Sequence, residues 1–211
     1  MKLHFLGGAD EIGASRTLVE MDGHRVLVDA GIRMGASPGA HLPNFSALDE
    51  FGPPDEVLVT HAHTDHTGAL PVLVAGLPPD VPIRMTAPTD ALKIMEKRGE
   101  RDGELPVYLP EAVDVCLSRI TSVPTLATLP ICEGKLSATW IPAEHILGAA
   151  SIYIEGQTGG LLMTGDVPVS EQQTIPGMIV PQCRPDVVVM ESTYGDRQHA
   201  DRSQQETSFA L

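Results

Sequence analysis

The feature that most constrains this chain is a run of four metal-binding side chains within six positions. His61, His63, Asp65 and His66 follow directly on the apolar run 57–59. Side chains alternate in direction along extended backbone, so His61 and His63 are expected to point the same way. Asp65 and His66 come where the chain leaves the strand and can face a second point nearby. Imidazoles with a carboxylate suit zinc better than calcium or magnesium. A polar turn that is rich in histidine by chance is the weaker alternative, so the pattern predicts a metal site.

Length and composition set the size of the fold. A chain of 211 residues with 42% apolar side chains predicts one domain, 1–211, with a hydrophobic core. The 20 glycines and 18 prolines indicate many short strands and turns rather than long helices.

The net charge of −14 limits how the chain can contact nucleic acid. Broad phosphate-binding surfaces depend on Lys and Arg. Any phosphate-binding role is therefore expected to be local to the metals, or to be completed by a partner or another domain.

The three cysteines favour a reducing compartment. Cys116, Cys132 and Cys183 are far apart and form no C-x-x-C motif, so a disulfide framework is not expected. The N-terminal apolar stretch is too short for a secretory signal, and no run approaches membrane-spanning length. A cytoplasmic protein without a membrane partner is predicted.

Apolar periodicity and turn residues predict an alternation of short strands and helices, which indicates a layered α/β domain. Asp22-Gly23 is a strong hairpin signal, because both central residues of a type I′ turn need positive φ. Strands are expected at 3–6, 17–21, 25–29, 57–59, 81–87, 137–141, 151–155, 161–164 and 186–190, the last fully buried; helices are expected at 69–74, 89–97 and 110–120, and a surface loop at 33–54.

Acidic or histidine residues stand where five of these strands end, where α/β folds place their sites. They are Asp29, His61, His145, Asp166 and Glu191. His145 is a candidate third ligand. Asp166 shares that metal site if the strands before the two residues are adjacent, as expected here. Asp29 either begins a turn or accepts a hydrogen bond from a ligating histidine and fixes its tautomer.

The motif H-x-H-x-D-H, after a strand and before a helix, resembles the signature of the metallo-β-lactamase superfamily. Three further stretches resemble its β-CASP branch, the nucleic-acid-processing group that includes RNase J and the endonuclease subunit of the cleavage and polyadenylation factor. They are Gly148-Ala149-Ala150, Thr164-Gly165-Asp166 and, most discriminating, Glu191-Ser192-Thr193-Tyr194-Gly195. The resemblance covers nearly the whole chain.

This resemblance implies an αββα sandwich, two mixed sheets face to face with helices outside, and a centre of two zinc ions, with manganese as an alternative. A hydroxide bound between the metals would attack phosphorus in line. The resemblance implies that one zinc is bound by His61, His63 and His145, that a second is bound by Asp65 and His66, and that Asp166 bridges both. It also implies that Asp29 orients a ligand and that Asp65 has a catalytic role. Glu191, the second residue with an implied catalytic role, would position the site or the attacking water.

The chain departs from the β-CASP pattern after Glu191. In that branch a large β-CASP domain follows, with a histidine that protonates the leaving group, and a last histidine then joins the second metal. Here only His199 lies downstream of Glu191, and its spacing fits neither role. We therefore expect a domain that is truncated at its C-terminus, without the β-CASP domain and closing elements, whose open sheet edge would allow a homo-oligomer.

The leading functional prediction is a metal-dependent ribonuclease that cleaves RNA, with DNA as a further possible substrate. One alternative is a small-molecule hydrolase of the same superfamily, such as a thioesterase or lactonase. The other is a metal-binding fragment without catalytic activity.

Overall fold

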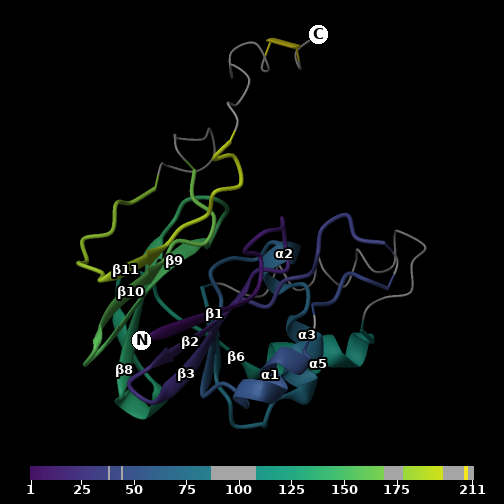
Figure 1. The fold of residues 1–211 in the computed structure, drawn as a ribbon, viewed down its shortest axis with the longest axis horizontal. Helices are drawn as coiled ribbons and strands as arrows, with labels where there is room; N and C mark the ends of the chain where they lie inside the picture. Colours follow the sequence, from purple (N-terminus) through teal and green to yellow (C-terminus); the bar gives the residue numbers. More distant parts are fainter. Residues whose placement is uncertain (38, 44, 87–107, 169–177, 197–206, 209–211) are drawn as a thin grey trace.

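A computed structural model describes residues 1–37, 39–43, 45–86, 108–168, 178–196 and 207–208. Two mixed β-sheets lie face to face, and helices lie against the outer side of one of them (Figure 1). The predicted class, two mixed sheets with helices, is confirmed. The predicted helix at 89–97 lies outside the described residues.

Within the described residues the first sheet has six strands, and it begins with an antiparallel pair. Its order follows the chain, with β1–β3 antiparallel and β3–β6 parallel. The predicted turn between β2 and β3 is confirmed, since φ is 51° at Asp22 and 83° at Gly23. The strands are β1 (Lys2–Gly7), β2 (Arg16–Met21), β3 (His24–Val28), β4 (Glu56–Leu58), β5 (Ile83–Met85) and β6 (Ile120–Ser122).

Among the described residues, three helices lie on the outer face of this sheet, as Figure 1 shows for their arrangement. They are α1 (Ser46–Phe51), α3 (Leu70–Gly76) and α5 (Pro110–Arg119). Their apolar sides pack on the sheet in a cluster that includes Leu18, Leu27, Val57, Ile83, Leu48, Leu70, Leu73, Val74 and Cys116. The prediction that 33–54 is entirely a loop is wrong at α1, because six residues are too few to show helical periodicity.

The second sheet, in the part of the chain that the structure describes, has five strands in the order β11-β10-β9-β8-β7. All its pairs are antiparallel except β10 with β11. The elements are β7 (Thr128–Ile131), the 3-10 turn η1 (Cys132–Gly134), β8 (Leu136–Pro142), β9 (Ala150–Gly156), β10 (Gly159–Met163) and β11 (Val187–Val189). β6 and β7 were not predicted from the sequence.

The core between the sheets is built by inward-facing side chains of both. Trp140 and Ile152 of the second sheet are fully buried in one cluster with Val19, Val28 and Leu58 of the first. Burying this apolar surface, at about 25 cal/mol per Å², holds the sheets together.

The prediction of a fully buried strand at 186–190 is wrong. Val188 is 52% exposed and Met190 is 65% exposed. β11 is the outermost strand of its sheet, so only its β10 side is covered by a neighbour in the part of the chain that the structure describes. An unbroken apolar run does not distinguish a central strand from such an edge.

An ion pair of the first sheet is hydrogen-bonded to the second sheet at one end of the sandwich. The Glu56 carboxylate, 1% exposed, contacts Arg84 within the first sheet and accepts a hydrogen bond from the backbone N–H of Cys132 in η1 (2.7 Å). Arg84 also donates to the carbonyl oxygen of Pro130 (3.0 Å). Burial raises the pKa of Glu56, and these donors oppose the rise.

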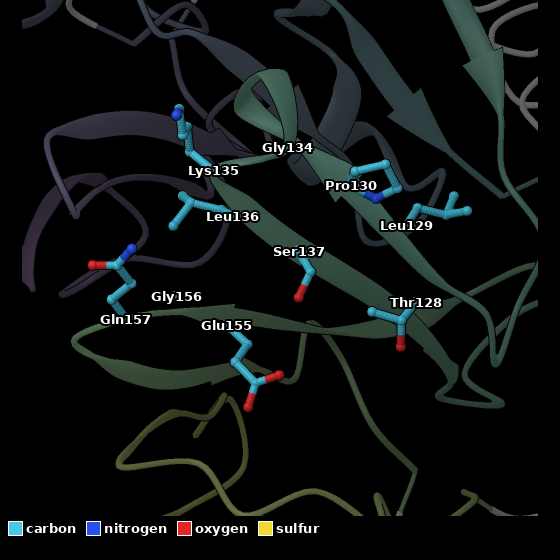
Figure 2. A pocket seen from close by; sticks show the side chains of 10 residues that line it. All are labelled: Thr128, Leu129, Pro130, Gly134, Lys135, Leu136, Ser137, Glu155, Gly156 and Gln157. Atoms are coloured by element: carbon cyan, nitrogen blue, oxygen red, sulfur yellow. The ribbon is translucent and has the colours of Figure 1, made fainter.

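A shallow hollow of about 410 Å³ marks the outer side of the second sheet (Figure 2). Thr128 and Ser137 line it from β7 and β8, and Glu155 lines it from β9. It holds no group of metal-binding side chains among the described residues. Within these residues, no helix has the length and apolar character that a membrane crossing needs.

Candidate metal centre

The predicted metal motif lies at one end of the sandwich, immediately after β4. His61 and His63 lie in the segment between β4 and the short helix α2 (Thr64–Thr67), and Asp65 and His66 belong to that helix. The neighbouring 30–32 segment holds this turn through its backbone. Ala30 N donates to His66 O (2.7 Å), and Ile32 N donates to Thr64 O (3.2 Å).

The second sheet brings the other two predicted ligands to the same place. His145 follows β8 and Asp166 follows β10. The expectation that these two strands are adjacent is wrong, because β9 lies between β8 and β10. The side chains nevertheless meet, with His145 Nε2 3.5 Å from Asp166 Oδ2. The six predicted ligand residues thus come together from two sheets.

The first group contains His61, His63, His145 and Asp166. His63 Nδ1 lies 3.1 Å from His61 Nε2 and 3.0 Å from His145 Nε2. Asp166 Oδ2 lies 3.8 Å from His61 Nε2. Three imidazole nitrogens and one carboxylate oxygen therefore face a common point.

This arrangement fits a tetrahedral cation. Zinc with bonds of about 2.0–2.1 Å separates its ligand atoms by about 3.3 Å, and four separations between these ligand atoms, 3.0–3.8 Å, bracket that value. Nitrogen lone pairs that converge this closely repel one another unless a proton or a cation lies between them. The donor set suits zinc, and manganese is also compatible.

The second group contains Asp65, His66 and Asp166. His66 Nε2 lies 3.2 Å from Asp166 Oδ1 and 4.0 Å from Asp65 Oδ2. Asp166 thus presents Oδ2 to the first group and Oδ1 to the second, the geometry of a bridging carboxylate.

The pKa values of the two buried histidines, His61 and His66, are shifted in opposite directions. Burial lowers the pKa of His61 to about 2, so its ring is neutral. Burial also acts to lower the pKa of His66, but the carboxylates of Asp29 and Asp166 outweigh it and raise that pKa to about 10. Burial acts to raise the pKa of Asp166, and the bond and charge from His66 instead bring it to about 2. Without metal, the second group holds an imidazolium–carboxylate pair.

Asp29 is placed to orient the predicted ligand His66. It follows β3 and is 2% exposed, and its φ of 63° is one that aspartate tolerates better than most residues. Asp29 Oδ2 is 2.8 Å from His66 Nδ1. Sequence reasoning gave no role to Thr60, whose backbone N–H and hydroxyl both donate to Asp29 (2.8 Å each). The sequence feature that could have pointed to Thr60 is its position between the apolar run 57–59 and His61.

Glu191 is not among the residues that converge on either group. Its Oε1 accepts a hydrogen bond from Val167 N (3.0 Å), and its Oε2 accepts one from Thr193 N (3.3 Å). It therefore ties the loop after Asp166 to the segment after β11. The catalytic roles of Glu191 and Asp65 stay predictions.

A cavity of about 770 Å³ opens beside the second group. Its walls come from the 7–13 loop, the end of β10 and the segment after β11, and include Asp29, Thr60, Asp65, His66, Asp166 and Glu191. None of its lining residues in the described part of the chain is Lys or Arg. The described lining thus offers a phosphate no Lys or Arg, and the imidazolium of His66 is already paired with Asp166.

Several curated proteins are similar to most of this chain. Integrator complex subunit 11 of Danio rerio is 28% identical over 92% of the chain, and endoribonuclease ysh1 of Schizosaccharomyces pombe is 31% identical over 95%. Transcription termination factor FttA of Methanocaldococcus jannaschii is 30% identical over 96%. The chain spans 34%, 27% and 34% of their respective lengths. These relatives are members of the β-CASP branch, as the sequence motifs predict.

Solved structures share the fold at low sequence identity. The archaeal metallo-β-lactamase superfamily protein ST1585 from Sulfolobus tokodaii has a TM-score of 0.50 and 20% identity, over 85% of this chain and 67% of that one. A protein of unknown function from Enterococcus faecalis has a TM-score of 0.55 and 16% identity, over 80% and 44%. Residues 24–207 match the family described as "Beta-lactamase superfamily domain". The chain belongs to the β-lactamase superfamily.

Proposed function

We propose that this chain carries a two-metal centre for the hydrolysis of RNA phosphodiester bonds. The proposal is based on the position of Asp166, whose two carboxylate oxygens face two separate groups of ligand atoms. The endoribonuclease name of the S. pombe relative supports RNA as the substrate class. When bound, two zinc ions supply a nucleophile at neutral pH and neutralise charge on phosphate oxygens.

The residues of the chain contribute position and charge. His61, His63 and His145 would hold one metal, Asp65 and His66 would hold the other, and Asp166 would contact both. The Asp29 carboxylate holds His66 so that its Nε2 faces the second group. The adjoining cavity, whose described lining residues include no Lys or Arg, would receive the phosphate next to the metals, where cationic charge is available.

Metal removal combined with one ligand substitution tests the proposal. The zinc-loaded or manganese-loaded chain is expected to cleave a fluorescent RNA, and a chelator is expected to abolish cleavage. His63→Ala removes a first-group ligand and should also abolish it. His24→Ala removes a partly buried histidine near Asp55, at the other end of β3, and serves as the matched control.

Two results would contradict this function. One is a folded, metal-loaded chain that cleaves neither RNA nor DNA. The other is hydrolysis of thioesters or lactones in place of nucleic acid, which would assign the chain to the small-molecule hydrolases of the superfamily.

A further inference from the structure

Thr60 lies between the two ligand groups but belongs to neither. It follows β4, directly precedes His61, and is 1% exposed. Its hydroxyl oxygen lies 2.8 Å from Asp29 Oδ2, 3.1 Å from His61 Nδ1 and 3.4 Å from His66 Nδ1. One buried hydroxyl therefore contacts a carboxylate and lies close to one histidine of each group.

The hydrogen-bonding capacity of these groups determines where the protons lie. An ionised carboxylate only accepts, so the single hydroxyl proton of Thr60 is donated to Asp29. The hydroxyl oxygen then offers only lone pairs to His61 Nδ1, and a bond at 3.1 Å requires a proton on that nitrogen. His61 Nε2 is thereby left unprotonated, and this is the atom that faces His63 Nδ1 and Asp166 Oδ2.

His66 is oriented by the same carboxylate oxygen without an intermediary. Its Nδ1 donates to Asp29 Oδ2 (2.8 Å), which leaves Nε2 facing Asp166 Oδ1. Asp29 thus orients the second-group histidine directly and can reach the first-group histidine only through Thr60. Gly165, next to the bridging Asp166, packs on the same residue, because a Cβ there would lie 2.9 Å from Thr60 Cβ.

We propose that the Thr60 hydroxyl is a positioning group that fixes the Nδ1–H tautomer of His61 and so places both metal positions under the control of one carboxylate, Asp29. This inference rests on the proposed metal centre and is independent of whether RNA is the substrate. Thr60 then orients His61 at the first metal position, and the Asp29–His66 hydrogen bond orients His66 at the second.

Substitution of Thr60 should affect the two positions unequally. Thr60→Val keeps the β-branched shape but leaves His61 Nδ1 without its acceptor. Loss of such a partner weakens metal binding roughly 10- to 100-fold. We expect this loss at the first position, a smaller change at the second, and recovery in Thr60→Ser, which keeps the hydroxyl. Thr67→Val is the matched control, since Thr67 is also 1% exposed and its hydroxyl donates to the His63 backbone oxygen (3.1 Å).

Two measurements test this without reference to catalysis. Titration of the metal-free variants with Co²⁺ gives an affinity for each position, and the visible absorption of tetrahedral Co²⁺ identifies the first. Nitrogen-15 NMR of the histidine rings in the metal-free wild-type chain reports the tautomer directly, and His61 is expected as Nδ1–H. The NMR measurement needs no variant to fold.

The possible outcomes separate the two proposals. A wild-type chain that binds no divalent metal overturns the proposed function. A wild-type chain that binds two metals while Thr60→Val retains wild-type affinity at both overturns the role of Thr60. That role is also overturned by an Nε2–H tautomer at His61 in the wild type, or by a loss in Thr60→Val that Thr60→Ser does not recover.

Discussion

Gly31 crosses the backbone of Asp65 so closely that a Cβ at position 31 would lie 1.5 Å from the Asp65 carbonyl oxygen. The atom in the way is backbone and cannot turn aside as a side-chain tip could. The hydrogen bonds from Ala30 and Ile32 on either side hold the two segments at this spacing. The metal-binding turn therefore depends on the absence of a side chain in a different part of the chain.

Gly31→Ala is expected to destabilise the protein and weaken metal binding, because it separates the turn from the 30–32 segment. Overpacking against a rigid neighbour costs about 1–3 kcal/mol or more in the free energy of unfolding. Chemical denaturation measures the change. Gly76→Ala, where nothing lies within 4 Å of the added Cβ, is the control and should be neutral or slightly stabilising. Equal stability of the two variants would contradict the prediction.

Asp166→Ala and His63→Ala should differ in metal content. Asp166 offers an oxygen to each group, whereas His63 belongs only to the first. We expect Asp166→Ala to lose metal from both positions and His63→Ala to keep the second. Elemental analysis of purified protein at neutral pH gives the ratio. Identical ratios for the two variants would argue against a bridging role for Asp166.

Metal binding at the second position should release a proton from His66. Its pKa of about 10 in the metal-free chain means that Nε2 is protonated at neutral pH. The metal displaces that proton, so affinity at this position should rise about tenfold per pH unit from pH 7 to 9. Titration in weak buffer with a pH indicator counts the protons. His61, with a pKa of about 2, should release none, and a pH-independent second affinity would contradict the assignment.

The same pKa predicts how the stability of the metal-free chain changes with pH. His66 is raised from an ordinary value of 6.5 to about 10, so its contribution is complete below pH 6.5 and is lost as pH rises through 10. The melting temperature of the metal-free wild type should therefore fall toward that of His66→Gln between pH 7 and 10. A gap between the two proteins that stays constant across this range would be inconsistent with the prediction.

RNA binding should require metal. The cavity beside the second group has carboxylates and no Lys or Arg among its described lining residues, and the chain carries a net charge of −14. Fluorescence anisotropy of labelled RNA is expected to show binding by the zinc-loaded chain and none by the metal-free chain at the same ionic strength. Equal affinities would show that RNA binds through another surface.

The metal motif was predictable because its ligands are close in sequence. A strand followed by a turn determines how His61, His63, Asp65 and His66 can point, whatever the rest of the fold does. His145 and Asp166 depend on strand order, and local pattern does not reveal that β9 separates their strands. The predicted burial of β11 was wrong for the same reason. An edge strand and a central strand can have the same apolar sequence pattern, so the pattern does not reveal the place of a strand in its sheet. Thr60 was missed because its contacts with Asp29 and His66 are made only after folding.

The ion pair of Glu56 and Arg84 has a consequence for the metal-free protein. Through their hydrogen bonds to Cys132 and Pro130, these two residues link the sheets at the end remote from the predicted ligands, four of which follow a strand of one sheet and two of which follow strands of the other. Metal would add a further link between the sheets at the other end, beside the backbone hydrogen bond from Ala150 N to Thr60 O (3.0 Å). Removal of metal should therefore accelerate amide exchange around His145 and Asp166, while the Cys132 amide stays protected.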